Sequence, residues 1–117
     1  MGDTRVIDLA VLAELIGPNP DKLTQFALRF VESTRAGLVE LDACLERGDM
    51  ARIRELGHRI KSSARIVGAF GMAELCERPE HLAPAARAAE LAAARALAGQ
   101  LWPLLEHIGA ALAAPGP

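Results

Sequence analysis

The chain has 117 residues, of which 51% are hydrophobic and 24% charged, the size and composition of one folded domain with a sizeable core. A formal net charge of −2 and the absence of tyrosine argue against nucleic acid as a partner, because phosphates attract cationic surfaces and bases stack on aromatic rings. No apolar run approaches the roughly 20 residues that cross a bilayer, so no direct membrane contact is expected.

The composition also favours helices and a reducing compartment. Alanine and leucine are abundant, whereas aromatic residues make up only 3% of the chain. Cys44 and Cys76 lie far apart among apolar residues, which favours buried free thiols over a disulfide or a zinc site. We therefore predict one cytoplasmic all-α domain over residues 1–117, with an ordered core over about residues 5–112.

Capping residues delimit the first two predicted helices. A short helix begins after Asp8 as its N-cap, continues to about residue 16, and stops at Gly17-Pro18. Asn19-Pro20 then starts a long helix that ends at Gly48. Its apolar positions recur at spacings of three, four and eight, which predicts one buried stripe: Leu23, Phe26, Phe30, Leu38, Leu41 and Leu45.

A third and a fourth helix follow. Asp49 caps the third, which Gly68 ends or bends and whose apolar stripe is Ile53, Leu56, Ile60, Ala64 and Val67. Met72, Leu75 and Cys76 predict the fourth helix. Pro79 must end or kink it, because proline lacks an amide donor and clashes with the preceding turn.

The alanine-rich segment from Ala85 to about Leu112 predicts a last helix, interrupted and kinked at Pro103. Leucine and isoleucine recur near the helical period at positions 91, 97, 101, 105, 108 and 112. One short and four longer helices, each with one apolar stripe, pack most simply as an antiparallel four-helix bundle with a short extra N-terminal helix at one end.

His58 stands out on the third predicted helix. At about 100° per residue it lies about 170° from the centre of the apolar stripe, so we expect it to face water. Arg54, Lys61 and Arg65 share its face at i−4, i+3 and i+7, and Ser62 at i+4 is small enough to leave the ring open. Three cations around an imidazole outline an anion site, and a merely solvated charged face is the alternative.

Other chemistries of this histidine fit the sequence poorly. None of the three histidines has a second metal ligand at i+4, so no metal site is expected. Ser62 and Ser63 on an exposed helix offer neither a pocket nor an oxyanion hole for hydrolysis. The stretch Gly68-Ala-Phe-Gly71 is too short for a nucleotide-binding loop. We therefore expect a chain without autonomous ATP-dependent activity, which accepts a phosphoryl group rather than taking one from ATP.

The run His58-x-Ile-Lys61-Ser-Ser63-(x)4-Gly68-Ala69, followed by Leu75-Cys76, resembles the signature of histidine-containing phosphotransfer (HPt) domains of multistep phosphorelays. The likeness covers nearly the whole chain. It implies a phosphorelay intermediate of bacterial two-component signalling, in which His58 accepts a phosphoryl group from a receiver-domain aspartate and passes it to another. The response-regulator receiver would supply Mg²⁺, and this chain would bind no cofactor of its own.

The same resemblance implies roles for the neighbours of His58. Lys61, with an exposed side chain, would contact the phosphoryl oxygens. Arg54 and Arg65, which helical spacing puts on the same face, are expected to complete the phosphoryl- and receiver-binding set. Ser62 stands where the family usually has glycine to let the receiver approach. An apolar patch from the first helix and from the second and third helices beside His58 would dock the receiver, and the chain would act as a monomer.

Alternatives remain open at this point. The chain also resembles the C-terminal HPt module of unorthodox hybrid sensor kinases, where it would be tethered to the inner membrane through its parent; a free-standing phosphotransfer protein is the rival. A kinase dimerisation domain is disfavoured, because Arg59 and Ser63 replace the acidic residue and the proline that would follow its histidine. A non-catalytic helical adaptor could instead bind an acidic partner through the basic face around His58.

Overall fold

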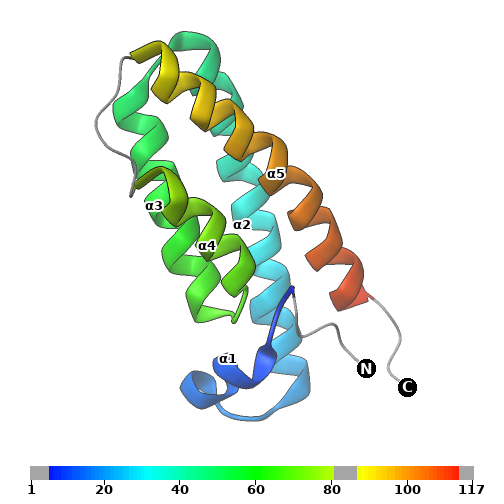
Figure 1. Ribbon diagram of the computed structural model, residues 1–117. Helices are drawn as coiled ribbons and strands as arrows, with labels where there is room; N and C mark the ends of the chain where they lie inside the picture. The colour runs from blue at the N-terminus through cyan, green and yellow to red at the C-terminus, as the bar shows by residue number, and fades with distance from the viewer. Residues whose placement is uncertain (1–5, 81–86, 114–117) are drawn as a thin grey trace.

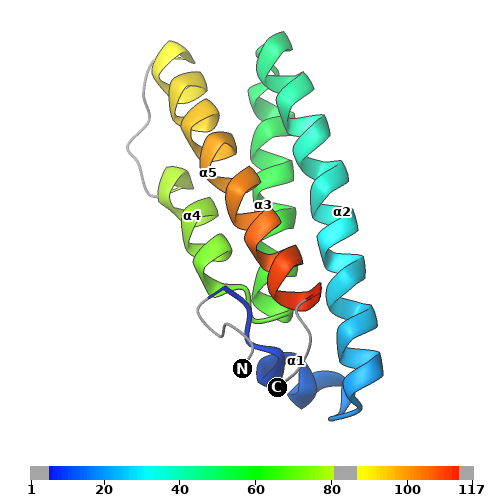
Figure 2. The same cartoon turned by 90° about the vertical axis from the view of Figure 1, so that its right-hand side faces the viewer.

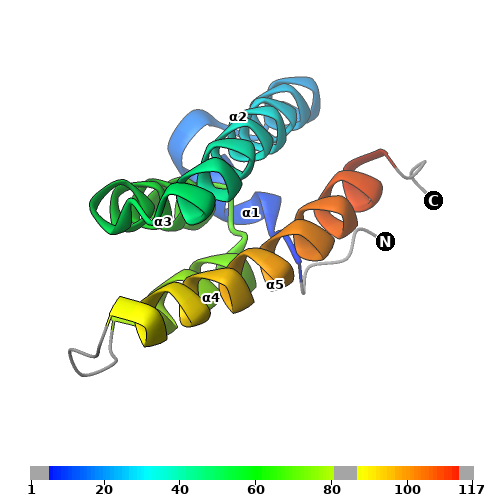
Figure 3. The same cartoon turned by 90° about the horizontal axis from the view of Figure 1, so that it is seen from above.

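The computed structural model describes residues 6–80 and 87–113, which fold into five α-helices without a strand. Figure 1 shows four of them side by side, successive ones antiparallel, and the shortest at one end. Seen from above in Figure 3, the four form two layers, α2 with α3 and α4 with α5. The predicted four-helix bundle with a short N-terminal helix is confirmed. The helices are α1 (Leu9–Ile16), α2 (Pro20–Arg47), α3 (Met50–Ile66), α4 (Phe70–Glu80) and α5 (Arg87–Ala113).

Side-chain caps set the starts of the first three helices, as predicted. The carboxylate of Asp8 accepts a hydrogen bond from the first turn of α1 at 3.1 Å, and that of Asp49 accepts one from the first turn of α3 at 3.2 Å. The amide oxygen of Asn19 accepts two from α2, at 3.0 and 3.2 Å. Gly48 ends α2 with a φ of +67°, a conformation that other residues rarely adopt.

The turn between α3 and α4 holds the N-terminal segment against the bundle. The backbone N–H of Asp8 donates to the carbonyl of Gly68 at 3.0 Å, and Val6 and Ile7 are buried beside it. Gly68 has a φ of +77°, and a Cβ there would collide with the carbonyl oxygen of Asp8. A glycine is therefore required at Gly68 both by the backbone conformation and by the close approach.

The core follows the predicted stripes with one exception. Every predicted core residue of α3 is buried, as are Cys44 and Cys76, whose thiols are free. Phe26, however, is 40% exposed, so its prediction as a core residue was wrong. The buried stripe of α2 includes Ala27, Val31 and Thr34, and Phe26 lies about 80° from its centre.

Both prolines lie inside helices. Helix α4 continues through Pro79 to Glu80, the last residue described before Arg87, so the helix does not end at Pro79, and a kink there stays a prediction. Helix α5 continues through Pro103, so the helix is not interrupted there, and the expected kink stays a prediction. The carbonyl that loses its donor belongs to Gly99, which is exposed and open to water. Ala85, the expected first residue of this helix, lies outside the described residues.

Candidate functional site

His58 lies on the solvent side of α3, in its central turns. The ring is exposed, whereas the apolar stripe of the same helix, from Ile53 to Val67, points into the core. Ser62, one turn further on, is exposed and short, so it leaves the ring accessible from that side. The prediction that His58 faces water is confirmed.

The two arginines on the face of His58 have partners that the sequence did not indicate. Arg54 Nη2 lies 2.8 Å from Glu90 Oε2 on α5, and Arg65 forms an ion pair with Glu77 on α4. Both pairs join α3 to the opposite layer of the bundle. The structure therefore brings Arg54 and Arg65 to the expected face, but it also neutralises much of their charge.

Lys61 differs from its prediction. Its side chain is only 8% exposed, so the expectation of an exposed lysine was wrong. Lys61 lies about 100° from the centre of the apolar stripe of α3, on the flank that packs toward α4. A long aliphatic stem at such an edge is readily covered by a neighbouring helix. Substitution of Lys61 must therefore affect packing as well as any contact with a phosphoryl group.

The opposite flank of α3 carries a cation that the sequence interpretation missed. Arg59, directly after His58, is exposed and points toward the α2 side. Within the described part of the chain its side chain forms no ion pair or hydrogen bond, unlike those of Arg52, Arg54 and Arg65. The sequence could not single it out, because the carboxylates that occupy Arg54 and Arg65 come from other helices.

A groove of about 190 Å³ separates α2 from α3 beside Arg59. We call it the α2–α3 groove. It is lined from α2 by residues between Ser33 and Glu40 and from α3 by residues between Leu56 and Ser63. Its α3 wall includes the residue that follows His58, so any protein seated on the histidine covers the groove as well.

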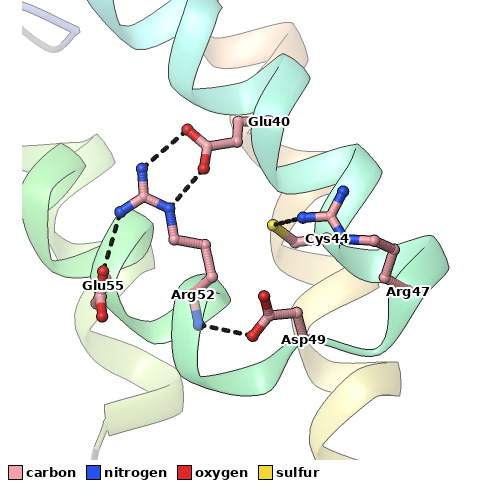
Figure 4. Close-up of polar contacts among 6 residues, drawn as sticks. All are labelled: Glu40, Cys44, Arg47, Asp49, Arg52 and Glu55. Carbon is pink, nitrogen blue, oxygen red and sulfur yellow. Dashed lines mark hydrogen bonds and ion pairs between the residues drawn. The ribbon is translucent and has the colours of Figure 1, made fainter.

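An ion-pair clamp closes one end of this groove. Arg52 on α3 binds both carboxylate oxygens of Glu40 on α2, through Nε at 2.5 Å and Nη2 at 2.9 Å (Figure 4). Its third nitrogen, Nη1, donates to Glu55 at 2.9 Å. The hydrogen bonds from Arg52 lower the pKa of Glu40 below its ordinary value. The clamp adds a contact between α2 and α3 to the burial of the apolar stripe of α3, which turns His58 outward.

Exposed apolar side chains gather at the α1 end of the bundle. Figure 2 shows α1, the start of α2, the end of α3 and the start of α4 together at this end. Each of these segments exposes large apolar side chains there, namely Leu15, Ile16, Phe26, Ile66 and Phe70, which we call the apolar patch. Ile66 of the patch belongs to α3, the helix that also carries His58; a role of the patch in docking a receiver stays a prediction.

Two absences bear on the kind of site. The described residues contain no group of three or more histidine, cysteine, aspartate or glutamate side chains placed to hold a metal ion. In the same ranges, no helix combines the length and apolar character that a membrane crossing requires. His81 lies outside the described residues.

Comparisons with known proteins agree with the geometry. Over 80 residues, 65% of this chain, the sequence is 29% identical to multistep phosphorelay regulator 1 of Schizosaccharomyces pombe, and it spans only 27% of that protein. The crystal structure of histidine-containing phosphotransfer protein B from Pseudomonas aeruginosa PAO1 is similar over 94% of this chain and 93% of that one, with a TM-score of 0.77 and 27% identity. Residues 25–114 match the Hpt domain, and the chain therefore belongs to the Hpt domain family.

Proposed function

We propose that this chain is a phosphorelay intermediate in which His58 accepts a phosphoryl group from a receiver-domain aspartate and passes it to the aspartate of a second receiver. The observation that carries the proposal is a solvent-facing imidazole at the centre of α3 in an Hpt domain. The names of the two relatives, a phosphorelay regulator and a phosphotransfer protein, point to the same role.

The transfer needs little from this chain beyond the ring. A nitrogen lone pair of His58 attacks the phosphorus of the acyl phosphate, the N–P bond forms, and the bond between phosphorus and the aspartate oxygen breaks to leave a carboxylate. The second transfer reverses these steps on another aspartate. Mg²⁺ for the reaction is bound by the receiver.

The neighbours of His58 support this chemistry. Lys61, Arg54 and Arg65 place positive charge on the flank of α3 next to the ring, where it favours a dianionic phosphoryl group. Arg54 and Arg65 sit in solvent-accessible ion pairs, which are worth little, so a phosphoryl group can compete for their guanidinium groups. Ser62 leaves room for the receiver to approach.

The apolar patch gives the receiver a place to dock. Its side chains expose apolar surface at the end of the bundle where α3, the helix of His58, finishes. The domain acts as a monomer in the cytoplasm, either alone or tethered to the inner membrane through a parent sensor kinase. A net charge of −2 supports a protein partner rather than nucleic acid.

The test is phosphoryl transfer from a panel of phosphorylated receivers. At least one receiver is expected to label the wild-type chain with a phosphate that is labile in acid and stable in alkali. His58→Gln should abolish the label and leave the circular dichroism spectrum unchanged, whereas His107→Gln, at an exposed histidine on α5, should be labelled normally. Label retained by His58→Gln would exclude this histidine as the acceptor.

The adaptor alternative is less well supported. An adaptor gives no role to the solvent-facing imidazole of an Hpt domain, which is the observation that carries the phosphorelay proposal. It predicts partner binding that is insensitive to His58→Gln, together with no phosphate uptake from any receiver.

A further inference from the structure

The α2–α3 groove is open because one of its positions lacks a side chain. A Cβ added at Gly37 would lie 3.8 Å from Ile60 Cδ1, an ordinary van der Waals distance, so no clash requires glycine at this position. The space in front of Gly37 is accessible to an incoming side chain. Ser33 and Ser63 expose hydroxyl groups at the walls, one from each helix.

The charges in the groove favour an acidic occupant. Its carboxylate, Glu40, is already bound at both oxygens by Arg52, which neutralises it. Arg59, on the α3 wall, forms no ion pair or hydrogen bond with any described residue, and its charge only adds to that of Arg52 in lowering the pKa of Glu40. An exposed guanidinium in a groove that also holds two serine hydroxyl groups is a good donor set for a carboxylate, which arginine binds through two parallel hydrogen bonds.

The location of the groove ties it to the proposed reaction. Arg59 follows His58 directly, and Ser63 lies at i+5 on the same helix. A standard protein interface buries about 800 Å² on each partner, far more than the surface of one histidine. A receiver that brings its phosphorylated aspartate to His58 therefore also covers the groove.

We propose that the α2–α3 groove is the specificity subsite of this domain, which takes an acidic side chain from the docked receiver and pairs it with Arg59. The proposal rests on the proposed function. Receivers that carry such an acidic side chain next to their phosphorylated aspartate are accepted, and receivers without it dock weakly. The groove acts on recognition and takes no part in the bond changes at His58.

Two variants test the subsite, each with a matched control. Arg59→Gln removes the cation, and Arg95→Gln removes an equally exposed arginine on α5. Gly37→Leu fills the groove without changing charge, and Gly99→Leu adds the same side chain at an exposed glycine of α5 that has nothing within 4 Å of its Cβ position. Circular dichroism checks that each variant is folded. If Gly37→Leu does not fold, Arg59→Gln alone tests the subsite.

The measurement is KM and kcat for transfer from each phosphorylated receiver of the panel. For the preferred receiver, Arg59→Gln and Gly37→Leu should each raise KM by about tenfold or more, with kcat and the half-life of the phosphohistidine unchanged. The two α5 variants should stay within about twofold of wild type. The double variant should raise KM little beyond the larger single effect, because both changes act on one subsite.

The failures of the two proposals are distinguishable. If the wild-type chain takes phosphate from a receiver but the order of preference across the panel is the same in Arg59→Gln and Gly37→Leu, the subsite is wrong and the proposed function stands. If no receiver labels the wild-type chain, the proposed function fails and the subsite fails with it.

Discussion

Arg52 and Glu40 join the histidine helix to its neighbour through two hydrogen bonds of 2.5 and 2.9 Å between one guanidinium and one carboxylate. Such a two-point contact fixes the relative orientation of both groups, which a single ion pair does not. Arg52 precedes His58 by six residues, about 9 Å along the axis of α3. The clamp therefore supports the rotation of α3 that its buried apolar stripe sets, with the reactive ring facing outward.

The clamp predicts a specific loss of stability in acid. Because Arg52 lowers the pKa of Glu40 in the folded state, the contribution of Glu40 to stability is present above the ordinary glutamate pKa of 4.5 and is lost as the pH falls through the lower folded-state value. Glu40→Gln should lower the urea midpoint of unfolding at neutral pH. In the same variant the midpoint should decrease less between neutral and acidic pH than it does in the wild-type chain. Glu106→Gln, which removes an ion pair with Arg35 on an exposed surface, serves as the control. Equal acid dependence in wild type and Glu40→Gln would contradict this account.

Alanine substitutions at two glycines, one within α3 and one just after it, should change the free energy of unfolding in opposite directions. Gly68→Ala places a Cβ at a positive φ and against the carbonyl of Asp8, so it should destabilise the fold by at least about 1–2 kcal/mol. Gly57→Ala meets nothing within 4 Å inside α3 and should stabilise by about 0.5–1 kcal/mol. Urea unfolding of both variants measures the difference. Destabilisation by Gly57→Ala would show that the packing around His58 is tighter than the structure indicates.

The features that could be predicted from the sequence are those that depend on residues close together in the chain. Asp8, Asn19 and Asp49 cap helices through their own first turns, and their positions alone located the helix starts. The apolar stripe of α3 placed His58 on the opposite side, because one helical period relates all these residues. The helix boundaries and the orientation of the reactive ring follow from interactions within a few residues along the chain.

Contacts between helices could not be predicted in this way. Lys61 is buried and Phe26 is exposed because of the positions of the neighbouring helices. Those positions cannot be predicted from the type of either residue or from its place on its own helix. Arg54 pairs with a glutamate 36 residues away, whereas Arg59 forms no ion pair within the described residues. The charge pattern of one helix therefore named the face of His58 but could not show which of its arginines are paired across helices.

Burial of Lys61 changes what its substitution measures. Lys61→Ala removes the covered stem as well as the charge, so it should lower both stability, by about 1 kcal/mol, and the rate of transfer. Lys61→Met keeps an apolar stem of similar length and should lose less stability while slowing transfer as much. Unfolding in urea and single-turnover transfer from a phosphorylated receiver separate the two effects. A Lys61→Met chain that transfers at the wild-type rate would remove this residue from the reaction.

The apolar patch should contribute to docking beyond its contribution to the fold. Phe70 is 52% exposed and Ile66 43%, so about half of each side chain is buried, and replacing either by serine should lower the free energy of unfolding by about 1–2 kcal/mol. If the patch docks the receiver, each folded variant should raise KM for transfer several-fold and leave kcat unchanged, because the exposed half of the side chain is lost from the complex. Val39→Ser is the matched control, since Val39 is 59% exposed on α2 but is not part of the patch. An effect of Val39→Ser equal to that of Phe70→Ser would mean that general surface hydrophobicity, and not this patch, governs the encounter.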